Sequence, residues 1–132
     1  MRTSGATPLQ RLLRRADFLR AARGVKAATP GLVLQVRRRS PDETGADDRP
    51  RVGYTASRKV GNAVIRNRAR RRLRSAVTDV LSARAQAGHD YVLIARAATA
   101  ERAYDDLLAD LDKALDRAAG NRDNRSSREP RS

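Results

Sequence analysis

Apolar residues recur at helical spacing in the middle of this 132-residue chain. At about 100° per residue, the apolar side chains of this segment fall within an arc of about 80°. They are Ile65, Ala69, Leu73, Ala76 and Val80. The spacing predicts a helix over residues 62–85, with Asn62 as its N-cap and Gly88 beyond it as a stop signal.

Two other segments are predicted to be helical. Residues 103–118 place leucines and a tyrosine on one face and aspartates on the other, which is typical of an amphipathic helix. Residues 8–22 predict a short helical region that ends near Gly24, with Asp17 as its N-cap or in its first turn.

Four stretches have patterns typical of β-strands. Residues 25–29 and 32–36 flank a Pro-Gly turn, and the second of them alternates apolar and polar positions. Residues 51–57 predict a strand that returns after a solvated hairpin connection. Residues 91–95 form a continuous apolar run, which suits a strand buried on both faces.

The predicted order is helix, three strands, helix, strand, helix, which indicates one domain of the α+β class. We place this domain at residues 9–118. The hairpin connection corresponds to residues 40–50, which are rich in Asp, Glu, Gly and Pro. Residues 1–8 and 119–132 are polar and are predicted to be disordered.

Positive charge is concentrated in the N-terminal half of the chain. The formal net charge is +14, from 29 basic and 15 acidic residues. Residues 1–74 carry 20 basic and 5 acidic residues, a net of +15, whereas residues 75–132 carry 9 and 10, a net of −1. On the predicted central helix, Arg68, Arg70, Arg71 and Arg74 lie opposite the apolar stripe. A solvated helix face usually mixes the two signs, so this face favours a polyanion such as a phosphate backbone.

The composition argues against several kinds of site. The chain has no cysteine and one histidine, His89, which is expected in a loop; disulfides are excluded and a zinc site is disfavoured. We find no nucleophile beside a base and no metal-ligand cluster, so we expect neither a protein catalytic residue nor a metal site. No apolar run approaches about 20 residues and no signal peptide is evident, so we expect a cytoplasmic protein without a membrane segment.

The central helix and the segment before it contain a specific motif. The lead-in V-G-Y-T-A-S-R-K-V-G-N occupies residues 52–62, and A-V-I-R-N-R-A-R-R-R-L-R follows it. Together with the Asp17-Phe18 pair and D-Y-V-L-I-A-R at 90–96, this motif resembles the signature of the bacterial ribonuclease P protein component, over roughly residues 9–117. The family's usual larger aliphatic residue is replaced by Ala69, and Ala22 stands where a second aromatic residue often follows the first.

The resemblance implies an α-β-β-β-α-β-α fold with a mixed four-stranded sheet and a left-handed β-α-β crossover, as in the second domain of ribosomal protein S5. It also implies the protein subunit of a ribonucleoprotein endoribonuclease, a hydrolase that removes the 5′ leader from precursor tRNA. The catalytic RNA would hold the Mg²⁺ ions and perform the chemistry. The protein would bind that RNA and the leader, broaden substrate use and lower the Mg²⁺ requirement. We expect one protein per RNA and a monomer when free.

The resemblance also assigns site residues. Those expected at the catalytic RNA are Arg58, Lys59, Arg66, Asn67, Arg68, Arg70, Arg71 and Arg74. A leader-binding cleft is expected around Phe18 and two outward side chains of the 32–36 strand, Val33 and Gln35. From the residues alone, Phe18 fits packing in the core as well as a platform on which a base stacks.

Other classes of function remain open at this point. One is a ribosomal-protein-like module that binds many RNAs. Another is a DNA-binding protein with the arginine helix in a major groove, although the sequence has no helix-turn-helix or dimerisation element. A protein nuclease with its own active site is the least favoured.

Overall fold

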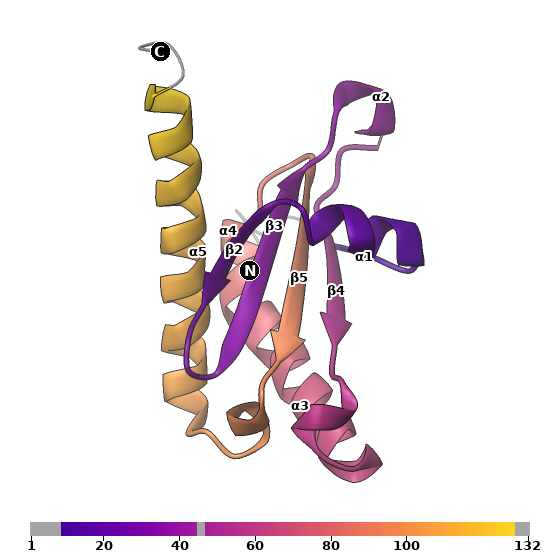
Figure 1. Ribbon diagram of the computed structural model, residues 1–132, viewed down its shortest axis with the longest axis vertical. Coiled ribbons are helices and arrows are strands. Elements are labelled where there is room, and N and C mark those ends of the chain that lie inside the picture. The colour runs from indigo at the N-terminus through magenta and orange to yellow at the C-terminus, as the bar shows by residue number, and fades with distance from the viewer. Residues whose placement is uncertain (1–8, 45–46, 129–132) are drawn as a thin grey trace, which may run out of the picture.

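The computed structural model describes residues 9–44 and 47–128 (Figure 1). The strands are β1 (Gln10–Arg11), β2 (Val25–Ala28), β3 (Leu32–Arg38), β4 (Arg51–Thr55) and β5 (His89–Ala95). The helices are α1 (Arg15–Ala21), α2 (Pro41–Thr44), α3 (Ala63–Ala76), α4 (Ser82–Arg84) and α5 (Tyr104–Arg128), with 3₁₀ turns η1 (Arg58–Val60) and η3 (Ala97–Ala100) and a π-helical turn η2 (Val77–Leu81). The predicted disordered segment 1–8 lies outside the described residues.

The strands form one mixed sheet in the order β1-β4-β5-β3-β2. β5 pairs parallel with β4 and antiparallel with β3. The prediction that residues 40–50 connect a hairpin is therefore wrong, because β3 and β4 do not pair but lie on either side of β5. The apolar run of β5 explains this order, since a strand that is apolar on both faces is best buried at the centre of the sheet.

The sheet has five strands in place of the four expected. The additional strand, β1, comes from residues 8–22, which were predicted to be helical throughout. The amides of Gln10 and Leu12 donate to the carbonyl oxygens of Pro50 (2.9 Å) and Val52 (2.8 Å), so this segment pairs with β4 before α1 begins. Asp17 was expected either as the N-cap or in the first turn of this helix, and it lies in the first turn of α1.

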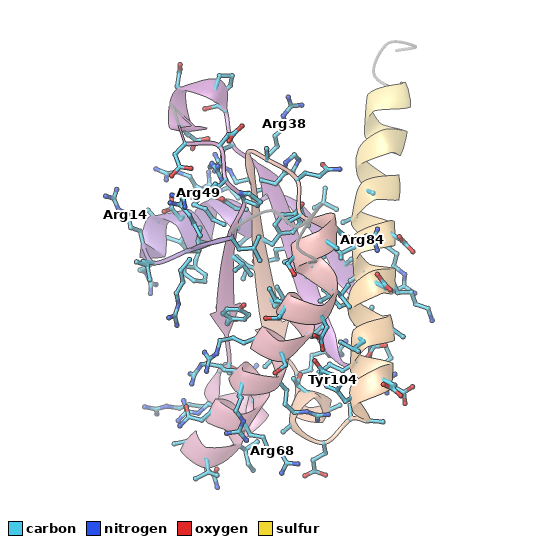
Figure 2. The ribbon with its side chains drawn as sticks, turned by 180° about the vertical axis from the view of Figure 1, so that it is seen from behind. Arg14, Arg38, Arg49, Arg68, Arg84 and Tyr104 are labelled. Carbon is cyan, nitrogen blue, oxygen red and sulfur yellow. The ribbon has the colours of Figure 1, made fainter. Side chains whose placement is uncertain are left out.

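The connection from β4 through α3 to β5 is a left-handed crossover, as expected. β4 and β5 run in the same direction, with β4 to the right of β5 in Figure 1 and α3 on the far side of the sheet. Figure 2, seen from behind, has α3 in front of the strands. This handedness is opposite to that of nearly all β-α-β units.

Each face of the sheet has its own cover. α3 and α5 pack on one face, where they enclose the larger core, which includes Leu34, Leu73, Leu93 and Leu111. α1 lies on the other face and covers a small cluster around Leu12, Ala21 and Val92. The second face is therefore only partly covered.

The predicted helix over residues 62–85 is present, but a π-helical turn interrupts it. In an uninterrupted α-helix Leu81 would lie about 160° from Ile65, on the arginine face. The extra residue of the π turn rotates the following residues back, and Leu81 is fully buried. Burial of this leucine is a reason for the interruption.

α5 continues to residue 128, into the range 119–132 that was predicted to be disordered. Residues 104–129 contain no proline that would interrupt the backbone hydrogen bonding of α5.

A buried carboxylate joins three segments at one end of the sheet. Asp90 of β5 is fully buried and accepts hydrogen bonds from Arg39 at 2.6 Å and from Arg51 of β4 at 2.8 and 2.7 Å. A guanidinium nitrogen of Arg37 in β3 lies 3.9 Å away. Arg39 also donates to the carbonyl oxygens of His89 and Arg49, so one cation ties β5 to the segment before β4.

We predict that Asp90→Asn lowers the free energy of unfolding by about 3–5 kcal/mol, because it leaves Arg39 and Arg51 without their buried counter-charge. Urea unfolding followed by circular dichroism measures this change. The matched control is Asp112→Asn, which weakens the ion pair of Asp112 with Arg84. The Asp112 side chain is 56% exposed, so this substitution should lower the free energy of unfolding by less than about 1 kcal/mol. Equal effects of the two substitutions would contradict the prediction.

Candidate nucleic-acid interface

The junction between β4 and α3 is built by a glycine and an asparagine. Gly61 has φ of 152°, and a Cβ there would lie 2.9 Å from Cγ2 of Ile65, so both its backbone and its surroundings require glycine. The predicted N-cap is confirmed, since Oδ1 of Asn62 accepts a hydrogen bond from the amide of Ile65 at 3.0 Å. The first turn of α3 contains no acidic residue, so its positive end is not neutralised locally.

The arginines of α3 form an exposed cationic face. Ala69 and Leu73 are fully buried beneath the helix, whereas Arg68, Arg71 and Arg74 are exposed on its outer side. Arg68 points away from the molecule in Figure 2. Arg58 and Lys59 of η1 are exposed next to the start of this helix.

None of the cations predicted to contact RNA has an acidic partner among the described residues. Arg70 donates to Oδ1 of the exposed Asn67 at 2.9 Å, which orders both side chains without neutralising the charge. Nε of Arg66 is buried and lacks a hydrogen-bond partner. A face of this kind has donors and charge available for an anion.

Arg72 is an exception within the arginine cluster. Its guanidinium donates to the carbonyl oxygen of Thr99 at 2.9 Å and to that of Arg102, and so it ties α3 to the segment around η3. At about 100° per residue Arg72 lies at the flank of the apolar stripe, about 20° from Ile65, and these contacts give it a structural role.

The residues predicted for a second RNA site lie on the opposite face of the sheet. Val33 pairs with Ile94 and Gln35 with Val92, and these side chains share the face on which α1 lies. Phe18 of α1 is half-buried and rests over β4, where a Cβ on Gly53 would lie 2.6 Å from two of its ring atoms. Phe18 thus combines packing with partial exposure. Gln35 is 8% exposed, so little of it is open.

The structure therefore divides the predicted site residues into two groups. The α3 arginines lie on one face of the sheet, and Phe18, Val33 and Gln35 lie on the other. Arg58 and Lys59 follow the end of β4, the strand that both groups adjoin. The protein presents two surfaces separated by one sheet.

The carboxylates on the α1 face are paired with arginines. Asp17 accepts from Arg20 at 3.0 Å, and Glu43 accepts from Arg37 at 2.6 Å, which lowers the pKa of Glu43 to about 2. Among the described residues no three acidic or histidine side chains gather as metal ligands. The donor set that the described part offers therefore does not fit a Mg²⁺ site. His89, expected in a loop, is the first residue of β5 and is buried.

Within residues 9–44 and 47–128, no helix has the length and apolar character needed to cross a lipid bilayer.

One part of the cationic surface was not anticipated. Arg11 of β1 and Tyr54 of β4 border a groove beside α3, and the guanidinium carbon of Arg74 lies 5.9 Å from the centroid of the Tyr54 ring. In the sequence, Tyr54 lies within residues 51–57, for which we predicted only a strand. Because β1 was not predicted, nothing indicated that Arg11 lies near α3.

Comparisons with known proteins agree with this arrangement. The model of the Ribonuclease P family matches residues 7–119. The ribonuclease P protein component of Paramagnetospirillum magneticum is 57% identical over 113 residues, which cover 85% of this chain and 84% of that protein. That of Ruegeria pomeroyi is 49% identical over 105 residues, covering 79% of this chain and 82% of that protein.

Solved structures support the same assignment. The RNase P protein of Staphylococcus aureus superimposes with a TM-score of 0.65 at 26% identity, covering 82% of this chain and 94% of that one. The RNase P protein of Thermotoga maritima has the same fold, with a TM-score of 0.61 at 23% identity and coverage of 82% and 96%. From the motif, the fold and these relatives together, the chain belongs to the family of bacterial ribonuclease P protein components.

Proposed function

We propose that this protein binds the catalytic RNA of ribonuclease P through α3 and leaves the chemistry to that RNA. The observation that carries the proposal is the cationic face of α3, which has no acidic partner among the described residues. Like charges at this density repel one another, and an RNA backbone relieves the repulsion. Arg58, Lys59, Arg66, Asn67, Arg68, Arg70, Arg71 and Arg74 are the contacts we assign.

The separate roles of the RNA and the protein follow from the chemistry of phosphates and of arginines. Phosphate oxygens of RNA are suitable ligands for Mg²⁺, so the catalytic ions belong to the RNA and the substrate. Arginines that neutralise phosphates replace part of the diffuse cation atmosphere. The protein would thereby lower the Mg²⁺ needed for the RNA to fold and to bind precursor tRNA. No catalytic residue is assigned to the protein.

The second surface is proposed to bind the single-stranded 5′ leader of precursor tRNA. Phe18 offers an aromatic face that remains partly open, and Val33 is half-buried on the same side of the sheet. Unpaired bases stack on such platforms with little dependence on sequence. With one RNA surface on each side of the sheet, one protein molecule would join one catalytic RNA to one substrate. We expect the protein to act in the cytoplasm and to be a monomer when it is not bound to RNA.

The experiment that tests this function is cleavage of a 5′-extended precursor tRNA at limiting Mg²⁺, with protein alone, catalytic RNA alone and both. We expect cleavage at the mature 5′ end only when both are present. Cleavage by the protein alone would mean that the protein has its own active site. Tight RNA binding without stimulation would indicate a general RNA-binding module, and a preference for duplex DNA at matched salt would indicate a DNA-binding protein.

We predict that Arg68→Ala with Arg71→Ala weakens binding to the catalytic RNA roughly tenfold and reduces the slope of log K against log [salt] by about 2, because two phosphate contacts are lost. Filter binding over a range of salt concentrations measures both quantities. The control is Lys113→Ala with Arg117→Ala, which removes the same charge from α5. If the α5 variant has the larger effect, the assignment of α3 is wrong.

We predict that Phe18→Ala weakens binding of a leader-bearing precursor tRNA to the holoenzyme about tenfold, since stacking on an aromatic side chain contributes ~1–3 kcal/mol per base. Binding of a substrate without a leader should not change. Leu19→Ala is the matched control, because Leu19 is the next residue of α1 and is 57% exposed. Equal losses for the two substrates would place the role of Phe18 in folding and not in leader binding.

A further inference from the structure

A groove runs between the β1–β4 edge of the sheet and the helix of α3 and η2. Its volume is about 270 Å³. The side chains that carry the argument are those of Leu9, Arg11, Val52, Tyr54, Arg74 and Val77. Val52 and Val77 are buried and form an apolar floor, while Arg11 and Arg74 are exposed at the rim. The groove therefore combines an apolar floor, an aromatic ring and two cations.

Tyr54 is held in place without being fully enclosed. Its ring packs against the larger core and is half-buried, with Arg74 on one side. Burial raises the pKa of the Tyr54 hydroxyl group, although Arg74 and Arg11 act in the opposite direction, so the ring is neutral at physiological pH. A neutral, fixed aromatic ring beside two cations is the combination that binds bases of unpaired nucleic acid.

The sheet edge beside this ring is open. β1 pairs with β4 only through Gln10 with Arg51 and Arg11 with Val52. Among the described residues no strand continues this pairing to Tyr54, so the edge of β4 there is accessible from the groove. Backbone groups at an open edge are available as hydrogen-bond partners.

The two sides of α3 differ in charge. On the side of the Tyr54 groove, Arg11 and Arg74 have no carboxylate partner in the described part of the chain. On the other side, a second groove is lined by Arg71 and Arg72 but also by Asp79, which accepts a hydrogen bond from the hydroxyl group of Tyr104 at 2.6 Å. The first turn of α5 adds Asp105 and Asp106. Tyr104 lies between α3 and α5 in Figure 2. Carboxylates therefore oppose an RNA strand on the α5 side of α3, whereas the Tyr54 groove offers cations without them.

We propose that the Tyr54 groove binds one unpaired nucleotide of the catalytic RNA, with its base against the Tyr54 ring and its flanking phosphates on Arg11 and Arg74. This inference rests on the proposed function, since it takes the RNA along α3 as given. It adds a site that contacts a base, in the groove beside α3, to the contacts already assigned to the arginines of α3. It also extends the RNA surface from α3 across the sheet edge to β1.

The test compares tyrosine variants on the two sides of α3. Tyr54→Leu keeps an apolar side chain against the core but removes the ring, and should weaken binding to the catalytic RNA about tenfold with an unchanged salt slope. Tyr54→Phe should bind as the unchanged protein does. Tyr104→Leu is the matched control on the α5 side and should have no effect. Arg11→Ala should weaken binding and reduce the salt slope by about 1.

Ultraviolet cross-linking of the unchanged protein to the catalytic RNA provides a readout that does not depend on the folding of any variant. Trypsin releases Tyr54 within the peptide V-G-Y-T-A-S-R, residues 52–58. A nucleotide adduct on this peptide, found by mass spectrometry, would support the proposal. Absence of the adduct, or affinity of the Tyr54→Leu protein within twofold of the unchanged protein, would overturn it.

The Arg68→Ala, Arg71→Ala variant measured in parallel separates this inference from the proposed function. If that variant loses affinity and Tyr54→Leu does not, the groove is empty in the complex and the role of α3 stands. If neither variant loses affinity, the RNA does not follow α3, and both the assignment and the inference fail.

Discussion

The buried carboxylate of Asp90 is the interaction on which the arrangement of this molecule depends. It lies on the central strand and neutralises arginines from the neighbouring strands, β3 and β4, and from the segment between them. A buried ion cluster of this kind tolerates no missing partner, because each remaining charge would be left without compensation. The pairing of β5 with both β3 and β4 is thus linked to one side chain.

The same interaction separates the charges of a very basic chain. Asp17, Glu43 and Asp90 are all engaged by arginines near one end of the sheet, on the α1 side. In α5, Asp112 and Asp116 bind Arg84, and Asp110 binds Arg102. These carboxylates are therefore unavailable to the exposed arginines Arg68, Arg71 and Arg74 of α3. A net charge of +14 becomes a directed surface because the negative charges have partners elsewhere.

Much of this could be predicted from local sequence patterns. The spacing of Ile65, Ala69 and Leu73 predicted α3 and its cationic face, and Asn62 predicted where the helix starts. Interactions between distant segments could not be predicted in the same way. Nothing local shows that β5 separates β3 from β4, that Gln10 pairs beside β4, or that Arg39 is buried against Asp90. These features depend on which strands meet, and neither strand propensity nor alternation encodes that. The RNA contacts assigned to single residues remain predictions.

The π turn of η2 has a consequence for how the long helix is used. Without the extra residue, Arg84 would lie about 100° from Ile65, toward the solvent side of the helix. With it, the last turn is rotated toward α5, and Arg84 binds Asp112 at 2.9 Å and Asp116 at 2.7 Å. Figure 2 shows Arg84 between α4 and α5. One inserted residue thus separates two sets of arginines on a single helix: Arg84 in the last turn is neutralised by carboxylates of α5, whereas Arg68, Arg71 and Arg74 in the earlier turns have no acidic partner among the described residues.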